Sequence, residues 1–391
     1  MQVGTFSVKP IEEGGIFCSS NIPLLYKHYD GQSSSLVIKN LENLKGSLGE
    51  VQELAKYQQV RLVWSRSNFI EDSSMAEDKA VLQKLRPHHD LETIEIEGYR
   101  GDEFCYWMMN INSSLPNLVT VKLSNIANCQ CLPPLGQLAN LEVLRISDMP
   151  SVRKVDGHVY GTEKPFRKLR ELELSTMKNL EEWSTTTLLL TGHNDHQLSR
   201  SEEVFPNLQV LLIANCPRMR FVPGFPRSRE CTLEKSCSIL LSFEQFIGSS
   251  NLALIALKIN DSGSSSDIVK FLQGCVNLLY LTIYSCIDLI TLPEPIKNCH
   301  CLRKLEITNC WNFSVLPEWL GEVTFLQKLD IQASKLEYLP QSIQRLTALE
   351  RLVLNKCNYK LRERCTSGED KEKIKHIKTI DMNEVTPTLD R

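Results

Sequence analysis

Four stretches of the chain carry the same pattern and decide the fold: 278-LLYLTIYSC-286, 302-LRKLEITNC-310, 326-LQKLDIQAS-334 and 349-LERLVLNKC-357. Each stretch begins with Leu, has an apolar residue at the fourth and sixth positions, and has Cys or Ser at the ninth. Counted from a related stretch that begins at Leu254, successive starts are 24, 24, 24 and 23 residues apart. A fixed period of this length indicates a repeat array in which each unit packs against its neighbours.

The same L-x-x-L-x-L pattern, with Ile or Val allowed at a Leu position, also occurs earlier in the chain, at Leu91, Leu118, Leu141, Leu169 and Leu208. Its alternating apolar residues predict a β-strand with one buried face. One unit cannot bury its apolar edge alone, so the units must stack. We therefore expect an α/β leucine-rich-repeat solenoid, a curved horseshoe with parallel strands on the concave face and irregular coils and short helices on the convex face.

The regularity of the repeats divides the chain. Residues 1–90 form an irregular N-terminal repeat-like region, with strands expected near Leu36–Ile38 and Val60–Trp64 and a helix over Met75–Leu85. Residues 91–183 are the first repeat block, 184–203 a polar loop excursion, 204–358 the second block and 359–391 a C-terminal cap or tail. The 46-residue step from Leu208 to Leu254 predicts two coils, one of them degenerate near Leu233–Phe246.

The ninth position of the pattern is expected to be a small side chain that satisfies backbone groups inside the array. It is Cys at four places: Cys216, Cys286, Cys310 and Cys357. Because a free cysteine behaves as a small apolar residue, we predict that these four thiols are buried and reduced.

Composition excludes several classes of function. Lys plus Arg number 44 and Asp plus Glu 47, a formal charge of −3 that provides no electrostatic footprint for nucleic acid. The sequence has no run of 18 apolar residues, so no membrane span is expected. The first ten residues lack the apolar core of a signal peptide, so we expect a reducing, cytoplasmic location.

Motifs for catalysis or metal binding are absent. The sequence contains no H-E-x-x-H, G-x-S-x-G or G-x-G-x-x-G, so we expect no enzyme and no cofactor. The pairs Cys129/Cys131, Cys299/Cys301 and His193/His196 lack the second pair that a zinc site usually shows, so no metal site is predicted.

The outward residues of the predicted strands are the candidate binding surface. They face solvent on the concave side and are not needed for stacking. Tyrosine and arginine are favoured at interface centres because they combine contact area with a polar group. The candidate protein-binding residues are Tyr280, Tyr284, Lys304, Glu306, Lys328, Asp330 and Arg351.

Several longer segments resemble the leucine-rich-repeat region of plant coiled-coil NB-LRR (NLR) disease-resistance proteins. The segment 118-LVTVKLSNIANCQCLPPLGQLANL-141 is similar to a repeat unit of that family, with Ala139 where Pro is usual. The segments 62-LVWS-65, 82-LQKLRP-87 and 94-IEIEGYRGDEFCYW-107 are similar to further motifs of the family. The resemblance covers nearly the whole chain.

The resemblance implies a defence-related sensor whose concave face contacts a pathogen effector or a guarded host protein. The same face is expected to contact a nucleotide-binding domain in a full-length receptor. That family has a P-loop of the form G-x-x-x-x-G-K-[ST] in a domain ahead of the repeats, whereas this sequence has no Gly-Lys dipeptide. We therefore expect no ATP or ADP binding, and the chain looks like the second half of a receptor.

Two other binding functions are alternatives. A stand-alone leucine-rich-repeat adaptor or decoy, for example a substrate adaptor of a ubiquitin ligase, would call for an F-box-like helical module, which residues 1–90 do not clearly show. A secreted inhibitor of microbial enzymes would need a signal peptide, paired cap cysteines and an L-x-G-x-I-P repeat, none of which is seen.

Overall fold

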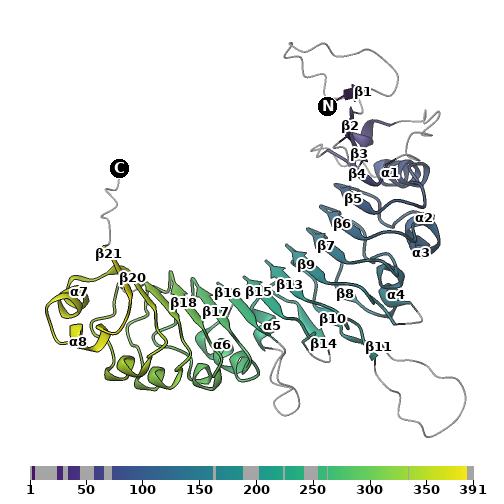
Figure 1. Cartoon of the computed structure of the whole chain (residues 1–391). Coiled ribbons are helices and arrows are strands. Elements are labelled where there is room, and N and C mark those ends of the chain that lie inside the picture. The colour runs from purple at the N-terminus through teal and green to yellow at the C-terminus, as the bar shows by residue number, and fades with distance from the viewer. Residues whose placement is uncertain are drawn as a thin grey trace, which may run out of the picture. The chain divides into compact units, whose positions relative to one another are not determined.

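A computed structural model describes residues 2–4, 24–29, 34–44, 57–65, 73–161, 164–187, 202–222, 225–241, 254–261, 263–332 and 334–384. The chain divides into two compact units. Unit 1 comprises Met1–Leu208 and Met219–Pro226, and unit 2 comprises Gln209–Arg218 and Arg227–Arg391. Each unit has a ladder of strands along one side and short helices along the other (Figure 1). We call the side formed by the ladder the strand face.

The ladder of unit 1 follows chain order. Its first two pairings, β1 with β2 and β2 with β3, are antiparallel, and every later pairing is parallel. The strands are β1 (Gln2–Gly4), β2 (Leu24–Tyr29), β3 (Ser34–Lys39), β4 (Gln59–Val63), β5 (Thr93–Glu97), β6 (Thr120–Ser124), β7 (Val143–Ser147) and β9 (Glu171–Ser175).

Shorter elements complete the coils of unit 1. Three short parallel strands form a second sheet in the order β14 (Arg220–Val222), β10 (Glu182–Ser184) and β8 (Lys154–Val155). The helices are η1 (Leu41–Asn43), α1 (Ser73–Lys84), α2 (Tyr106–Met109), α3 (Ile111–Ser114), η3 (Leu135–Gln137) and α4 (Gly157–Tyr160). The strands and the helix predicted before residue 90 are thus confirmed as β3, β4 and α1.

The polar excursion predicted at 184–203 falls mostly on residues 188–201, which lie outside the described part of the chain. The described residues on either side of it form an antiparallel pair, β11 (Thr186–Thr187) with β12 (Glu202–Glu203).

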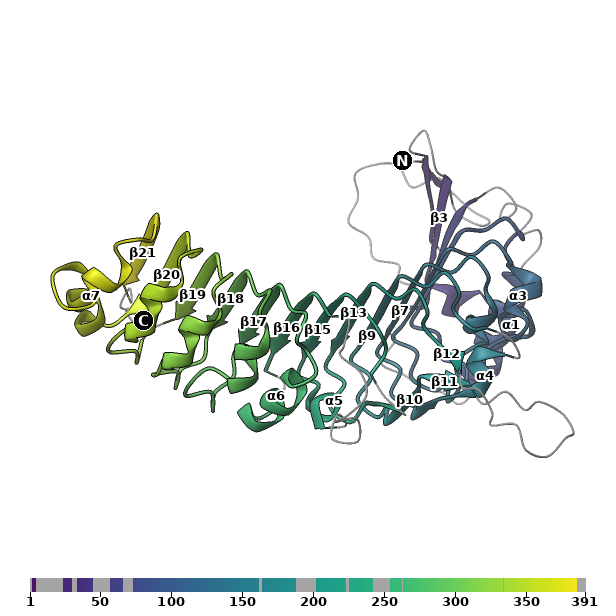
Figure 2. The same cartoon turned by 60° about the horizontal axis from the view of Figure 1, so that its bottom comes forward.

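The ladder of unit 2 is parallel throughout its described pairs. Its strands are β13 (Val210–Ala214), β15 (Glu230–Glu234), β16 (Ala256–Asn260), β17 (Tyr280–Tyr284), β18 (Lys304–Thr308), β19 (Lys328–Gln332), β20 (Arg351–Cys357) and β21 (Thr379–Glu384). The strand of the predicted degenerate coil is β15, which lies between the coils that begin at Leu208 and Leu254. The 3-10 helices and α-helices follow the opposite side (Figure 2): α5 (Cys237–Leu241), α6 (Ser265–Leu272), η5 (Glu294–Asn298), η6 (Glu318–Glu322), η7 (Gln341–Arg345), α7 (Tyr359–Thr366) and α8 (Lys371–Ile374).

The core of unit 2 is a set of apolar rows that run across the strands. Leu281, Leu305, Leu329 and Leu352 align in register, as do Ile283, Ile307, Ile331 and Leu354. Each of these side chains is fully buried. Full burial of one such side chain contributes about 1.5–3 kcal/mol. The leucine-rich-repeat solenoid predicted from the sequence period is therefore the fold of the protein.

The chain leaves most strands through a residue in the left-handed conformation. The positive φ angles occur at equivalent places in successive coils, at Asn125, Asp148, Thr176, Asn215, Lys235, Asp261, Ser285, Asn309 and Lys356. Asn and Asp tolerate this conformation better than other side chains, which explains their frequency here. The turn directs the next residue, the ninth of the pattern, into the core.

The cysteines at the ninth position are buried, as predicted. The thiols of Cys216, Cys286 and Cys310 each donate to the carbonyl oxygen two residues earlier, at sulfur–oxygen distances of 3.3, 3.7 and 3.5 Å. This position therefore satisfies a backbone carbonyl at the end of its own strand.

Candidate protein-recognition surface

The seven predicted binding residues all lie on the strand face of unit 2, on β17 to β20. Tyr280, Lys304, Lys328 and Arg351 align in one row across the strands. Glu306 and Asp330 are neighbours in the next row, and Tyr284 ends β17. Tyr280 is 44% exposed and Arg351 is also exposed, whereas the other five are half-buried.

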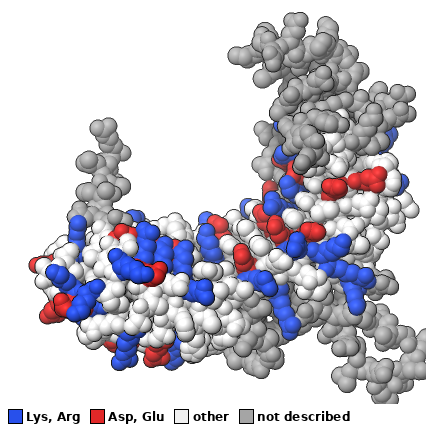
Figure 3. Space-filling model, in the orientation of Figure 1, with Lys and Arg blue, Asp and Glu red and all other residues white. Residues whose placement is uncertain are grey.

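Four charged residues of this face form a continuous ion-pair network. Lys304 Nζ lies 2.8 Å from Glu306 Oε1. Lys328 Nζ lies 3.2 Å from Glu306 Oε1 and 3.2 Å from Asp330 Oδ2. In the visible part of unit 2, Lys and Arg side chains stand out among uncharged residues, with acidic side chains scattered between them (Figure 3). The network links the long side chains of two neighbouring strands across the face.

The network shifts the pKa of two of its members, Glu306 and Lys328. Burial raises the pKa of Glu306, but hydrogen bonds from Lys304 and Lys328 outweigh it, so the pKa lies below the ordinary value. Burial lowers the pKa of Lys328, but hydrogen bonds to Asp330 and Glu306 outweigh it and the pKa is raised. The charges of Glu306 and Lys328 therefore persist at neutral pH.

The two tyrosines differ in their availability. The ring of Tyr284 is half-buried, and its hydroxyl accepts a hydrogen bond from the side chain of Asn309 in the next coil. Tyr280 is more exposed and starts the row of basic residues. Arg351, at the other end of that row, pairs with Asp381 of β21 at 2.8 Å between Nη2 and Oδ2.

Two outward positions of this face are buried, contrary to the expectation that such residues face solvent. Val353 is 6% exposed and Gln332 is 4% exposed. Val353 lies between Asp330 and Asp381 in the strand register, so a polar side chain flanks it on each side. Gln332 Oε1 accepts a hydrogen bond from the backbone N–H of Asn309 at 2.7 Å. Gln332 therefore contributes to the link between coils.

A second surface of unit 2 was missed by the sequence reasoning. Four apolar side chains just after β17 and β18 are exposed, and we call them the apolar edge: Ile287 (65%), Ile290 (57%), Trp311 (51%) and Val315 (37%). The backbone N–H groups of Ser314 and Val315 both donate to the carbonyl of Ile290, which places the two segments side by side. A signal was present in the sequence, because Ile287 and Trp311 directly follow the ninth-position cysteines.

Polar contacts brace the apolar edge. Asn312 Nδ2 donates to the carbonyl of Ile287 at 2.8 Å, and Lys335 Nζ donates to Asn312 Oδ1 at 2.6 Å. Lys356 Nζ lies 4.7 Å from the centre of the Trp311 ring. An exposed, braced apolar cluster with cations beside it has the composition of a protein contact site.

The strand face of unit 1 also carries charge networks. Arg61 pairs with Glu95 and Glu97, and Lys122 pairs with Glu95. These side chains, with Arg145, line a shallow hollow of about 350 Å³. A hydrogen bond to Glu97 is the main cause that raises the pKa of Arg61. The basic and acidic side chains that line the hollow pair with one another. The hollow is therefore polar and lacks the apolar character expected of an interface centre.

The cysteine pairs considered as metal ligands are each split between two environments. Cys129 and Cys299 are buried, whereas Cys131 and Cys301 are exposed. The Cys129 thiol donates to the carbonyl of Gly101, and the Cys299 thiol to that of Cys275. His193 and His196 lie outside the described residues. Among the residues that the structure describes, no helix is long and apolar enough to cross a membrane.

Comparison with known proteins agrees with the repeat pattern. Residues 27–149 match the family model described as R13L1/DRL21 LRRs. The chain is 31% identical over 270 residues to disease resistance protein RGA2 of Solanum bulbocastanum, covering 66% of this chain and 24% of that protein. It is 29% identical over 245 residues to the disease resistance RPP13-like protein 1 of Arabidopsis thaliana, covering 59% of this chain and 22% of that protein. The chain thus spans about a quarter of the length of these relatives.

Among solved structures, the leucine-rich repeat domain of the type III effector XopL matches at 21% identity with a TM-score of 0.38, covering 66% of this chain and 74% of that chain. The fold and the family match together define a leucine-rich-repeat protein. Its repeat region is of the type found in plant NLR disease-resistance proteins. These relatives are disease-resistance proteins, and their names give no support to the adaptor hypothesis.

Proposed function

We propose that this chain is the sensing region of a cytoplasmic plant immune receptor, and that unit 2 contacts a pathogen effector or a guarded host protein. The similarity to disease-resistance proteins supports the biological setting. The observation that carries the choice of unit 2 is the exposed apolar edge, in the same coils as the row from Tyr280 to Arg351.

The two surfaces have complementary roles in this proposal. The apolar edge provides the area that drives association, with Trp311 as the anchor, because tryptophan is enriched among residues that dominate binding energy. The row of Tyr280, Lys304, Lys328 and Arg351 sets orientation and partner choice, since charges on a binding face favour a complementary surface. Binding would act as a population shift, releasing a contact between the repeats and a nucleotide-binding domain in a full-length receptor. The chain itself carries out no chemistry.

The test uses matched variants of the full chain as bait. Tagged wild-type protein captures partners from infected and uninfected leaf extract, and each captured protein is then purified and titrated directly. The variants are Trp311→Ala on the apolar edge, Tyr280→Ala on the strand face, and Phe325→Ala as the control. Phe325 is 63% exposed in the same unit but belongs to neither surface.

A true partner is expected to lose at least about tenfold in affinity with Trp311→Ala and to lose affinity with Tyr280→Ala. It should bind Phe325→Ala as tightly as the wild type. If every purified protein binds the three variants equally, unit 2 is not the sensing surface. Transient expression with the partner in leaves provides the defence readout, and a cell-death response that ignores Trp311→Ala would also contradict the proposal.

A further inference from the structure

A turn in unit 1 brings two histidines and an aspartate together. The turn joins α1 to β5 and contains His88, His89 and Asp90. Pro87 before it and Leu91 after it are buried, and the backbone N–H of Leu91 donates to the carbonyl of His88 at 3.1 Å. The three polar side chains are therefore held at the surface by a turn that is anchored on both sides.

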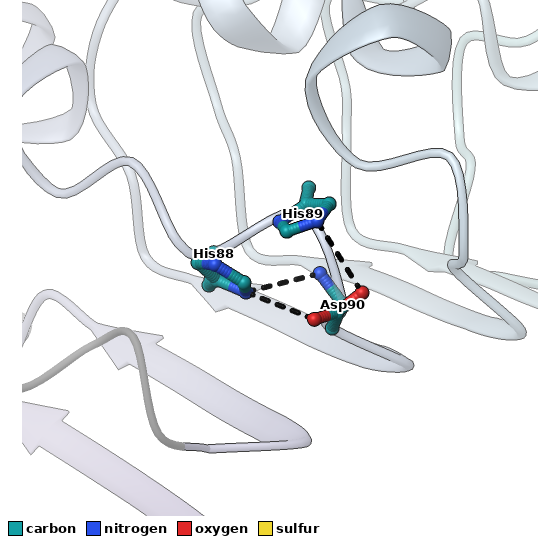
Figure 4. Close-up of side chains that lie close together, drawn as sticks. All are labelled: His88, His89 and Asp90. Atoms are coloured by element: carbon teal, nitrogen blue, oxygen red, sulfur yellow. Dashed lines mark hydrogen bonds and ion pairs between the residues drawn. The ribbon is translucent and has the colours of Figure 1, made fainter.

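The side chains of the turn converge (Figure 4). One ligand atom from each residue lies within 4.8 Å of the others. His88 Nδ1 is 3.3 Å from Asp90 Oδ2, and His89 Nε2 is 3.6 Å from Asp90 Oδ1. Ligands bound to zinc at about 2.0–2.1 Å are separated from one another by about 3–3.4 Å. Each imidazole nitrogen therefore lies close to that spacing from one oxygen of the Asp90 carboxylate.

The two imidazole rings share one side of the turn. Successive residues of an extended chain point in opposite directions, but here the ring centroids of His88 and His89 are only 4.0 Å apart. Asp90 faces both rings. His88 is half-buried, and His89 and Asp90 are exposed, so all three side chains have room to rotate. Small rotations would bring their three ligand atoms around one ion.

A residue of the next coil orients the carboxylate. Asn117 Nδ2 lies 3.3 Å from Asp90 Oδ1 and 3.4 Å from the carbonyl oxygen of His89. Metal-binding carboxylates are commonly held by such an outer donor, and its loss typically weakens metal binding by about 10–100-fold. The turn thus has three candidate ligands and one positioning residue.

The geometry points to a surface site for a borderline divalent cation such as zinc, formed by His88, His89 and Asp90 and positioned by Asn117. Two imidazole nitrogens and one carboxylate oxygen suit zinc, nickel or copper better than magnesium or calcium. Water would complete the coordination, since the site lies open to solvent. A cation bound there stabilises unit 1 because it binds the folded turn and not the unfolded chain. This inference is independent of the proposed function.

The experiment is a titration of the full-length, reduced chain with zinc chloride, followed by calorimetry, in a background that removes competing ligands. That background carries Cys131→Ser and Cys301→Ser, at the exposed thiols among the residues that the structure describes, and His193→Asn and His196→Asn at the remaining histidine pair. One equivalent of zinc is expected to bind. His89→Asn and Asp90→Asn should each weaken binding at least about tenfold, and Asn117→Ala should weaken it by a similar or smaller factor.

His300→Asn is the matched control, because His300 is also exposed but lies in unit 2. It should leave zinc binding unchanged. A cobalt titration adds a spectroscopic signature, with nitrogen and oxygen coordination expected and no thiolate-to-cobalt charge transfer. Absence of binding, or binding that His89→Asn and Asp90→Asn leave unchanged, would overturn the inference. A melting temperature that rises with zinc equally in wild type and His89→Asn would do the same.

Discussion

Lys356 Nζ lies 4.7 Å from the centre of the Trp311 ring, although the two residues belong to coils that are not neighbours in the ladder. Trp311 follows β18 and Lys356 lies in β20, so the contact passes over the coil of β19. Lys356 also adopts the left-handed conformation, with a φ of 48°. Lys356, from the second coil along, therefore contacts the Trp311 ring of the apolar edge, while half of the Trp311 surface remains exposed.

The first prediction is that Trp311→Ala changes binding and not folding. A cation–π contact at an exposed site is worth about 0.5–1 kcal/mol, and half of the Trp311 surface is buried. The free energy of unfolding should therefore fall by no more than about 3 kcal/mol. Phe325→Ala should have an effect of similar size. Urea unfolding followed by circular dichroism measures both, and a loss several times larger for Trp311→Ala would assign the ring to the fold instead.

The second prediction tests the inward and outward register of β18. Leu305 is fully buried and its neighbour Lys304 faces outward. Leu305→Asp removes apolar burial and buries an unpaired charge, so it should destabilise unit 2 by at least about 4 kcal/mol. Lys304→Ala breaks a partly exposed ion pair and should cost at most about 1 kcal/mol. Hydrogen exchange across β17 to β19 measures the two effects locally, and a larger loss of protection in Lys304→Ala would reverse the register.

The rows of buried Leu and Ile side chains could be predicted from the sequence, because apolar residues recur at the same positions of every repeat. A 24-residue period with alternating apolar residues has one simple solution, in which Leu281, Leu305 and Leu329 stack in register. The burial of the ninth-position cysteines followed from the same argument, since the pattern places this residue inside the array where the chain turns off the strand. Even the weakly patterned strand β4 was found, because its Val60 and Leu62 alternate with polar residues.

The surface could not be predicted to the same extent, because solvent-facing positions are not constrained by stacking. The apolar edge depends on residues after the strand, where the pattern specifies only turn geometry. The burial of Val353 depends on side chains of the two adjacent strands, which no periodicity within one strand reports. The convergence of His88 and Asp90 depends on the path of a single turn.

The third prediction concerns alkaline pH. Burial raises the pKa of the thiols of Cys299 and Cys357 to about 11, above the ordinary value of 9.0. The folded chain therefore keeps these protons while the unfolded chain releases them. Stability should fall as the pH rises from about 9 to 11, because the folded state binds more protons in that window.

Chemical unfolding at several alkaline pH values measures this slope. Cys357→Ala should reduce the slope relative to wild type, whereas Cys301→Ala, at an exposed thiol, should not. The same burial predicts that a thiol reagent labels Cys131 and Cys301 in the folded protein and reaches Cys216, Cys286, Cys310 and Cys357 only after unfolding. Rapid labelling of those four in the folded state would contradict the stacked coils.

The last prediction concerns the C-terminal coil, where Asp370 is fully buried. Its carboxylate lies 3.0 Å from Arg364 Nε and 2.7 Å from Lys373 Nζ, and it accepts a hydrogen bond from the backbone N–H of Leu339 at 3.0 Å. Burial raises the pKa of Asp370, but the bonds from Arg364 and Lys373 outweigh it and the pKa lies below its ordinary value. The carboxylate thus stabilises the coil at neutral pH, and that stability is lost as the pH falls through the lowered pKa.

Asp370→Asn keeps the size of the side chain and removes its charge, leaving Lys373 without its buried partner. Breaking a buried pair in this way should cost about 3 kcal/mol. Glu369→Gln is the control, because Glu369 contacts the same Arg364 at 2.8 Å while its side chain is 80% exposed, so no measurable change is expected. Hydrogen exchange of α7, α8 and β21 at neutral pH distinguishes the two. Since each coil packs mainly against its neighbours, the loss of protection in Asp370→Asn should stay within the last coils, and a loss that spread evenly across unit 2 would show that the unit unfolds as one block.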